Sequence, residues 1–318
     1  MSYIVGLDIG GTKCAVTLAS TLADSAPKIL KKVRFATEAD QPYAVLARFM
    51  TELDGMLAEL ALSYSEIAGI GISCGGPLNS EKGVILSPPN LPKWDRIEVC
   101  RYFYERTGIR CHLQNDANAS AVAEWKYGAG RGLRSLVFLT FGTGLGAGLI
   151  LDGRLYRGKN DNAGEIGHVR LSSCGPIGYG KAGSCEGFCS GSGIAQMGVS
   201  ALARSSEDSL LYRATDGDPN RVSAKLIAEL AREGDAACLD VYRTCARRLG
   251  ETLSILSDLL DPEAIILGGI FMRSDDLLLD GITEVMKREA LIPCPILKAG
   301  LGESIGDYAA LSIAESND

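Results

Sequence analysis

Aspartate, glycine, threonine and lysine gather in one short segment near the start of the chain, from Asp8 to Lys13. Two successive glycines, Gly10 and Gly11, let backbone N–H groups approach a ligand closely, and with the Thr12 hydroxyl they could hold phosphate oxygens. Asp8 could bind Mg²⁺ directly or through water, and Lys13 could bring positive charge to a phosphoryl group. The alternative is a simple hairpin turn with a solvated lysine, and this segment alone does not separate the two.

A second glycine-rich segment, from Gly142 to Ala147, matches the pattern G-x-G-x-x-A on paper. In dinucleotide-binding proteins a helix follows that pattern and points its positive end at a pyrophosphate. Here a strand-like run follows, so the sequence argues against a site of that kind. A second phosphate-holding hairpin, with Gly142, Thr143 and Gly144 as its contacts, is the better interpretation. Two such hairpins, one in each domain, could hold a triphosphate, and the pair is more specific than either turn alone.

The pair Asn115 and Asp116 stands where a short strand-like run ends and a helical run begins. Aspartate at the start of a helix is most often a cap. The functional alternative is a carboxylate that accepts the proton of a substrate hydroxyl, kept ionised by the helix N-terminus. If the reaction is phosphoryl transfer, which is largely dissociative, orienting that hydroxyl could matter more than the strength of the base.

Glu165, His168 and Glu186 are polar residues in glycine-rich stretches of the second half of the chain. Carboxylates accept hydrogen bonds, so the two glutamates are suited to binding hydroxyl groups of a substrate. The alternative for Glu165 is a carboxylate on a loop surface. The chain has only two histidines, and His112, beside a strand-like run, is interpreted as structural.

Three cysteines, Cys174, Cys185 and Cys189, follow His168 closely in the sequence. Four such ligands could form a tetrahedral zinc site. Their spacing contains no Cys-x-x-Cys or Cys-x-Cys pair, so we expect no zinc here. A metal- or redox-binding protein that uses this cluster remains a separate hypothesis, which metal analysis would test.

The elements that must position these residues repeat along the chain. Residues 3–8 and 14–19 predict two strands around the first glycine turn, and residues 135–140 and 147–151 predict two strands around the second. This repetition predicts two domains of related topology. Helical and strand-like runs alternate elsewhere, which favours α/β layers. The predicted helices cover residues 42–62, 96–106, 116–126, 221–232, 235–260 and 279–289, and further strands cover 68–73, 111–114 and 264–267. A last helix, from about residue 305, is predicted to pack on the first domain.

Composition limits the class of protein. The chain has 318 residues, of which 46% are hydrophobic and 22% charged, and its net charge is −7. A length of this order suits two globular domains. The acidic balance argues against nucleic acid or an anionic membrane as the main partner. The ten cysteines are scattered, and the sequence predicts neither a signal peptide nor a membrane span, so a reducing cytoplasm is the expected location.

Together these segments resemble the ROK family of sugar kinases, within the actin/hexokinase/Hsp70-like superfamily, and the resemblance covers essentially the whole chain. The segments that carry it are Asp8 to Lys13, Pro89-Asn90-Leu91, Asn115-Asp116-Ala117-Asn118, Gly142 to Gly146, Gly164 to His168, and Asp261-Pro262 through Gly268-Gly269. Their order along the chain matches the family, which makes a chance match very improbable.

The resemblance implies a fold and a set of roles. The fold would be two related α/β domains of the actin-like ATPase (ribonuclease H-like) type around a central cleft. The smaller would cover residues 1–115 plus about 301–318, and the larger 116–300. Asp116 would be the catalytic base. The sugar would contact Asn90, Asn115, Asp116, Glu165, His168 and Glu186. ATP would contact Asp8, Gly10, Gly11, Thr12, Lys13, Gly142, Thr143, Gly144, Gly268 and Gly269, with Mg²⁺ at Asp8.

Two features set limits on this resemblance. The family's zinc motif places a histidine before Cys-x-Cys-Gly-x-x-Gly-Cys-x-Glu, and this chain keeps Glu186 but not the cysteine positions. We therefore expect a loop held by packing, and the sugar preference is left open. Some relatives are repressors with an N-terminal helix-turn-helix, which we do not expect in a chain that begins at the first strand.

The sequence thus predicts ATP-dependent phosphorylation of a hexose, with glucose at its 6-hydroxyl as the first choice. N-acetylmannosamine, N-acetylglucosamine and fructose are the alternative substrates, and a non-catalytic sugar sensor of the same fold is the alternative of another class. A homodimer is expected because dimers are common in the family.

Overall fold

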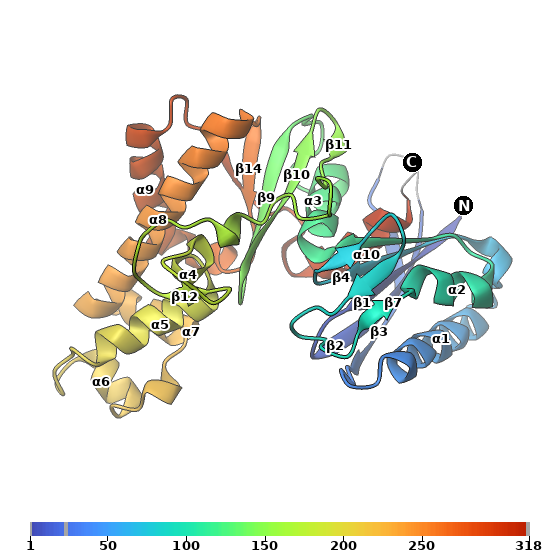
Figure 1. Cartoon of the computed structure of the whole chain (residues 1–318), viewed down its shortest axis with the longest axis horizontal. Helices are drawn as coiled ribbons and strands as arrows, with labels where there is room; N and C mark the ends of the chain where they lie inside the picture. Colours follow the sequence, from blue (N-terminus) through green and yellow to red (C-terminus); the bar gives the residue numbers. More distant parts are fainter. Residues whose placement is uncertain (1, 22–24, 316–318) are drawn as a thin grey trace. The chain divides into compact units, whose positions relative to one another are not determined.

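The computed structural model describes residues 2–21 and 25–315 (Figure 1). By its internal contacts the chain divides into two compact units. Unit 1 comprises Met1–Leu133, Gly148–Ala163 and Gly300–Asp318, and unit 2 comprises Arg134–Ala147 and Gly164–Ala299. The predicted division into a domain of residues 1–115 plus about 301–318 and a domain of residues 116–300 stays a prediction.

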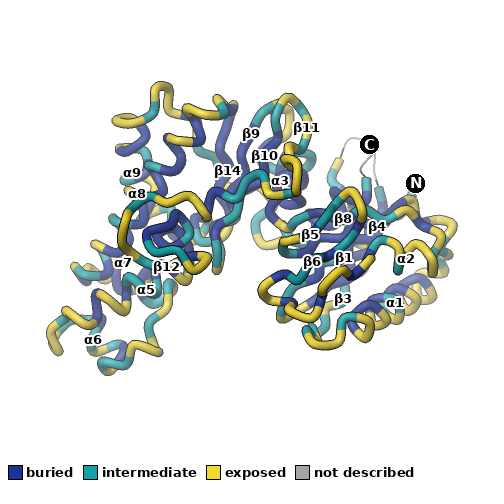
Figure 2. Tube along the Cα trace, viewed as in Figure 1, coloured by how far each residue is buried: buried dark blue, intermediate teal, exposed yellow. Residues whose placement is uncertain are grey.

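Unit 1 is built on a sheet of five strands in the order β3-β2-β1-β4-β8. The strands are β1 (Tyr3–Ile9), β2 (Lys13–Ser20), β3 (Lys28–Ala36), β4 (Ile67–Cys74) and β8 (Cys111–Asn115). The first three pair antiparallel, and β4 and β8 continue the sheet in parallel with β1. β1 consists mainly of apolar residues buried on both faces, as expected for a strand covered on two sides (Figure 2).

Helices cover both faces of this sheet. They are α1 (Pro42–Glu59), α2 (Val99–Thr107), α3 (Asp116–Tyr127) and α10 (Ile305–Ala314). Val5, Leu7 and Ile9 of β1 share a core with buried side chains of α1 and α2, whereas Ile4 shares a smaller cluster with Leu311 of α10. Because side chains alternate along a strand, Asp8 belongs to the α10 face. The prediction that the last helix packs on the first domain is confirmed.

A small sheet and two short helical turns complete the middle of unit 1. The strands are β5 (Leu78–Asn79), β6 (Val84–Leu86) and β7 (Asp95–Ile97), and the 3₁₀ turns are η1 (Tyr64–Glu66) and η4 (Gly302–Ser304). The predicted helix over residues 96–106 therefore begins later, at Val99, since the preceding residues pair in β7.

One buried carboxylate, that of Glu124 in α3, ties two distant segments of unit 1 together. Its Oε2 accepts the N–H groups of Ala129 at 2.8 Å and Gly300 at 2.9 Å, and its Oε1 accepts the N–H of Leu301 at 2.9 Å. The residue has no exposed surface. These bonds fix α3, whose first residue is Asp116, to the segment that leads into α10.

A second sheet, most of which belongs to unit 2, repeats the topology of the first. Its strands are β9 (Leu136–Phe141), β10 (Leu145–Leu151), β14 (Ala264–Leu267) and β15 (Ile296–Lys298), in the order β10-β9-β14-β15, with β11 (Arg154–Leu155) paired to the end of β10. The end of β10 and all of β11 fall within the Gly148–Ala163 segment of unit 1. As in unit 1, a hairpin is followed by two strands parallel to its first member. The predicted repetition of a strand, glycine turn and strand is confirmed.

Unit 2 carries most of the helices. They are α4 (Cys185–Phe188), α5 (Gly191–Leu202), α6 (Leu210–Thr215), α7 (Ala224–Arg232), α8 (Ala236–Leu260) and α9 (Phe271–Glu289). Smaller elements are the hairpin of β12 (Ile177–Gly178) and β13 (Lys181–Ala182) and the 3₁₀ turns η2 (Ile166–His168) and η3 (Pro219–Arg221). α8 and α9 pack along each other.

Several elements were not predicted from the sequence. β3 has no clear alternation of apolar residues, and α5 contains three glycines, which lower helix propensity. α5 nevertheless forms because Ser190 caps it by accepting the N–H of Gly193 at 3.0 Å and because its apolar face is buried. α9 begins at Phe271, eight residues before the predicted start. In the described part of the chain no helix is both long and apolar enough to cross a bilayer.

Candidate active site

The first glycine turn joins β1 to β2 and is fixed by backbone hydrogen bonds. The N–H of Gly10 donates to the Lys13 carbonyl at 3.2 Å, and the Thr37 hydroxyl donates to the Gly10 carbonyl at 2.7 Å. Thr12 and Lys13 are exposed. Neither Gly10 nor Gly11 has a positive φ, so close approach rather than backbone freedom explains the glycines here.

The neighbour that requires glycine at position 11 is Asn90. A Cβ on Gly11 would lie 2.5 Å from the Asn90 Cβ and 2.8 Å from the Asn90 carbonyl oxygen. Asn90 is exposed, in the proline-rich loop between β6 and β7. The structure thus brings a residue expected to bind sugar directly against the turn expected to bind phosphate.

Asp8 stands at the end of β1 among other charged groups of unit 1. Burial first, and then the nearby carboxylates of Asp116 and Asp307, together raise its pKa to about 7, although Lys32 and Arg34 act in the opposite direction. Asp307 is ion-paired with Lys32. Three carboxylates around one position form an acidic cluster, which a divalent cation would neutralise.

The sequence allowed Asp116 to be either the cap of α3 or a carboxylate available to a substrate. In the structure Asn115 is the cap. Asn115 is the N-cap of α3, because its Oδ1 accepts the N–H of Ala117 at 2.9 Å. Asp116 is the first helical residue rather than the cap, and its Oδ1 lies 2.8 Å from the same N–H. Aspartate as the cap, the commoner interpretation of the sequence, is therefore corrected to asparagine, which leaves the Asp116 carboxylate exposed to solvent.

Two opposing influences act on the Asp116 carboxyl. Crowding by protein atoms raises its pKa, and the N–H of Ala117 lowers it. The residue nevertheless keeps exposed surface, where water solvates the charged form. Its charge, in turn, is one cause of the raised pKa of Asp8, so the two carboxylates are neighbours.

The acidic cluster of unit 1 fits Mg²⁺ better than a metal that prefers sulfur or imidazole. Hard oxygen donors suit Mg²⁺, which usually keeps several waters and binds one or two carboxylates plus substrate phosphates. Within residues 2–21 and 25–315 no three His, Cys, Asp or Glu side chains are grouped closely enough to hold a metal by themselves. Asp8 would thus hold Mg²⁺ together with water and a bound phosphate.

The second glycine turn lies in unit 2, where it contacts the start of α5. The N–H of Gly191 donates to the Gly142 carbonyl at 2.8 Å, and the Ser192 hydroxyl donates to the Thr143 carbonyl at 3.0 Å. A second glycine pair, Gly268 and Gly269, follows β14, and the N–H of the next residue, Ile270, donates to the Phe141 carbonyl. The two segments predicted to hold ATP in this half of the chain are therefore adjacent.

Glu186 also contacts the second glycine turn. Its Oε2 accepts the N–H of Leu145 at 3.1 Å, and a Cβ on Gly144 would lie 2.6 Å from the same oxygen. Its Oε1 has no hydrogen-bond partner in the described ranges, so it is available to a ligand. Glu165 immediately precedes η2, and His168 is the exposed last residue of that turn.

The predicted site residues are divided between the two units. Unit 1 holds Asp8, the turn from Gly10 to Lys13, Asn90, Asn115 and Asp116, and unit 2 holds the turn from Gly142 to Gly144, Glu165, His168, Glu186, Gly268 and Gly269. Sequence reasoning missed Asp307, Lys32 and Tyr179. For Asp307 a signal existed, since it is the single charged residue of the apolar helix α10.

With this geometry established, comparison with known proteins identifies the family. The family model described as "ROK family" matches residues 4–316. The chain belongs to the ROK family.

Several ROK proteins resemble this chain over nearly their whole length. The glucokinase of Streptomyces coelicolor is 32% identical over 325 residues, which cover 100% of this chain and 99% of the relative. A crystal structure of a ROK family glucokinase from Streptomyces griseus, in complex with glucose and AMPPNP, has 29% identity and a TM-score of 0.76, covering 99% of this chain and 100% of that one. The ROK hexokinase from Thermus thermophilus has 28% identity and a TM-score of 0.82, covering 98% and 97%.

The predicted fold class is confirmed by these ROK structures. The chain has the α/β architecture of ROK sugar kinases, which is of the actin-like ATPase type. The duplicated sheet described above is the internal feature that corresponds to this fold.

Two of the three cysteines that follow His168 are buried as neighbours in this ROK protein, and the third is not. Cys185 is buried with its thiol 3.0 Å from the Thr252 hydroxyl, Cys189 is buried with its thiol directed at the Cys245 carbonyl, and Cys174 is exposed. The expectation of no zinc remains a prediction that metal analysis will decide.

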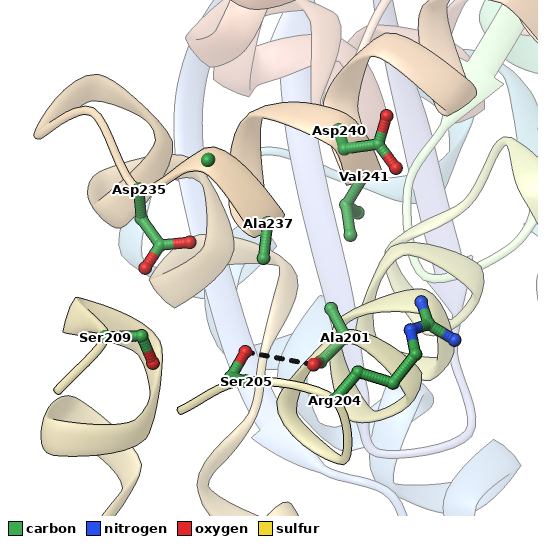
Figure 3. A pocket seen from close by; sticks show the side chains of 9 residues that line it. Ala201, Arg204, Ser205, Ser209, Asp235, Ala237, Asp240 and Val241 are labelled. Carbon is green, nitrogen blue, oxygen red and sulfur yellow. Dashed lines mark hydrogen bonds between the residues drawn. The ribbon is translucent and has the colours of Figure 1, made fainter. Parts of the chain in front are cut away.

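A separate hollow of about 350 Å³ lies in unit 2, and no predicted site residue lines it (Figure 3). It is bordered by the end of α5, the start of α6 and the start of α8, and Arg204, Asp235 and Asp240 are among its lining residues. Asp235 is engaged as the N-cap of α8. The hollow contains none of the motifs of the ROK resemblance, so we do not assign the active site to it.

Proposed function

We propose that this ROK protein is an ATP-dependent sugar kinase that transfers the terminal phosphoryl group of ATP to the 6-hydroxyl of glucose. The support comes from relatives named as glucokinases and from the Streptomyces griseus structure with glucose and AMPPNP. The observation that carries the proposal is the arrangement in unit 1, where Asp116 neighbours Asp8 and a glycine turn that contacts Asn90.

Asp116 is assigned the role of base. As the first residue of α3 it lies at the positive end of the helix, which favours the ionised carboxylate. Its exposure leaves it open to a sugar hydroxyl, whose proton it accepts as the phosphoryl group is transferred. Asn115, which caps the helix, fixes the backbone from which Asp116 projects and is proposed as a sugar ligand.

The other predicted residues are assigned to binding. Backbone N–H groups of both glycine turns, with Thr12 and Lys13, hold phosphate oxygens, and Gly268 and Gly269 contact adenosine. Asn90, Glu165, His168 and Glu186 hold sugar hydroxyls, for which the free Oε1 of Glu186 is suited. Mg²⁺ at Asp8, when bound, supplies positive charge that neutralises the transferred phosphate.

The deciding experiment replaces Asp116 and measures ADP release across a panel of sugars. Asp116→Asn keeps the side-chain shape and removes the base, so we expect kcat to fall by about 100- to 10,000-fold with little change in sugar affinity. Asp240→Asn, at an exposed carboxylate in the hollow of unit 2, is the matched control and should retain activity. Normal turnover in Asp116→Asn would remove Asp116 from its role.

The same panel separates the alternative substrates. Greatest kcat/KM with N-acetylmannosamine, N-acetylglucosamine or fructose would replace glucose as the substrate and keep the mechanism. A wild-type chain that binds a sugar but releases no ADP with any of them would be a sugar sensor instead of a kinase.

A homodimer in a reducing cytoplasm completes the proposal. All ten cysteines are free thiols, which suits a reducing compartment. Leu259, Leu291 and Ile292 of unit 2 are 74%, 89% and 73% exposed, and the Leu291 N–H bonds to Asp258 beside Leu259. Exposed apolar side chains of this kind suit a subunit contact. Sedimentation of wild type and of Leu291→Asp should give a dimer and a monomer; two monomers would contradict the dimer.

A further inference from the structure

The imidazole of His168 is held by one ring contact. Its centroid lies 3.9 Å from that of the Tyr179 ring, and the two planes meet at 27°, a stacked geometry. The backbone of His168 is bonded, since its N–H donates to Glu165 and its carbonyl accepts from Lys181. Across residues 2–21 and 25–315, however, neither ring nitrogen has a hydrogen-bond partner. The ring is therefore oriented by Tyr179 while both nitrogens are available to a ligand.

Tyr179 occupies a position that its residue type disfavours. It forms the two-residue turn between β12 and β13 with Gly180, and both have positive φ, +51° and +67°. Turns of this kind favour asparagine, aspartate or glycine, because a bulky side chain is strained in the left-handed region. Tyr179 is also 46% exposed, so burial in a core does not offset the strain. The stack on His168 gives a tyrosine at this position a role.

The hairpin that carries Tyr179 is anchored on both sides of the ring. The Lys181 ammonium donates to the His168 carbonyl at 2.7 Å, and the Ser184 hydroxyl donates to the Gly178 carbonyl at 3.1 Å. A Cβ on Gly167 would lie 3.2 Å from Cε2 of Tyr179, so the absence of a side chain at Gly167 lets the ring lie close to η2. The β12–β13 hairpin and η2 are thus packed against each other, with the Tyr179 ring beside His168.

We propose that Tyr179 is a positioning residue, which sets the orientation of the His168 imidazole before the sugar binds. The inference rests on the proposed function, because it assumes that His168 contacts a sugar hydroxyl. A side chain that is already ordered does not lose conformational entropy when the ligand arrives. Tyr179 should therefore lower the KM for sugar while leaving the KM for ATP unchanged.

Three substitutions at Tyr179 distinguish a role in orienting His168 from a role in stabilising the β12–β13 hairpin. Tyr179→Phe keeps the ring, and Tyr179→Ala removes it. Tyr179→Gly removes the ring but relieves the backbone strain, so it should not lower the stability of the fold. If the ring positions His168, the glycine and alanine variants should both raise the KM for sugar, by about 2- to 10-fold, and phenylalanine should restore it.

Nuclear magnetic resonance of the histidine ring protons gives a readout that does not depend on activity. The chain has two histidines, so His168→Gln assigns their signals directly. Stacking under an aromatic ring shifts the His168 signal, and we expect that shift to be kept in Tyr179→Phe and lost in Tyr179→Gly.

The outcomes distinguish this inference from the proposed function. An unchanged His168 signal in Tyr179→Gly, or an unchanged sugar KM after the signal has moved, would overturn the positioning role even in a fully active kinase. A loss of stability in Tyr179→Gly that matches its loss of sugar affinity would overturn it too. A wild-type chain that turns over no sugar would instead contradict the proposed function, while the signals would still decide whether the stack exists.

Discussion

The two glycine turns are alike in sequence, but their neighbours differ. In unit 1 the turn follows Asp8, whose pKa is raised by burial and by the charges of Asp116 and Asp307. In unit 2 the turn is bonded to the start of α5 and to the Oε2 of Glu186, which neighbours η2. The duplicated topology therefore supports two different environments. Unit 1 concentrates the carboxylates suited to phosphoryl transfer, and unit 2 links a phosphate turn to the loops proposed to recognise the sugar.

The strongest test of this contrast compares a carboxylate from each unit. We expect Asp8→Asn to lower kcat by about 100-fold or more at fixed Mg²⁺, since charge stabilisation at the transferred phosphate is lost. Glu186→Gln, in unit 2, should act mainly on the sugar, with a rise in KM of about tenfold. Steady-state kinetics with varied sugar and varied Mg²⁺ would check both. If Asp8→Asn changed only the sugar KM, the division of roles between the units would be wrong.

Two buried carboxylates, one in each unit, are expected to contribute differently to the stability of the fold. Glu124 accepts three backbone N–H groups with no exposed surface, whereas Asp235 caps α8 and accepts the N–H groups of Cys238 and Leu211. We expect Glu124→Gln to cost about 3 kcal/mol, because its amide N–H₂ replaces an acceptor that faces donors. Asp235→Asn should cost about 1 kcal/mol, since asparagine is also a good cap.

Urea unfolding of both variants against wild type measures these costs. Equal losses would mean that the link between α3 and the segment before α10 matters no more than an ordinary helix cap.

Adding a methyl group to each glycine turn gives a smaller, matched comparison. In Gly11→Ala the new Cβ meets the Asn90 Cβ and backbone oxygen, which cannot move independently of the loop, so we expect kcat/KM to fall about tenfold. In Gly144→Ala the Cβ meets the end of the Glu186 side chain, which can rotate away, and about twofold is expected. A greater loss in Gly144→Ala would show that the contact with Glu186 is the more sensitive one.

A further test concerns the dependence on pH. Because Mg²⁺ binding requires ionised Asp8, whose pKa is about 7, the apparent KM for Mg²⁺ should rise about tenfold from pH 8 to pH 6. For stability the sign is opposite. A carboxyl whose pKa is raised by folding favours the folded state when protonated, so its contribution is lost as pH rises from about 4 through about 7.

Asp8→Asn should remove both trends, which kinetics and thermal unfolding between pH 5 and pH 8 would measure. Asp307→Asn, which removes one of the charges that raise the pKa of Asp8, should shift the midpoint to lower pH. If Asp307→Asn left this pH midpoint unchanged, the Asp307 carboxylate would not be one of the charges that raise the pKa of Asp8.

Much of the fold could be predicted because its signals are local. The apolar strands on either side of each glycine turn and the stripe of α8 depend on residues close in sequence, and they lie where they were predicted. β3 and α5 were missed because pairing with β2 and burial in unit 2 outweigh weak local propensity. β15 was missed for the same reason, since parallel pairing with β14 joins residues far apart in the chain.

The sequence by itself determined the family, the order of the motifs and the residue types that could hold phosphate and accept a proton. Those features are identities and spacings, which need no coordinates. Only the tertiary structure decided that Asn115 rather than Asp116 caps α3, that Asn90 contacts Gly11, and that Asp307 and Tyr179 neighbour predicted site residues. Each of these is a contact between segments brought together by folding, and neither propensity nor periodicity within one segment encodes which partner it will meet.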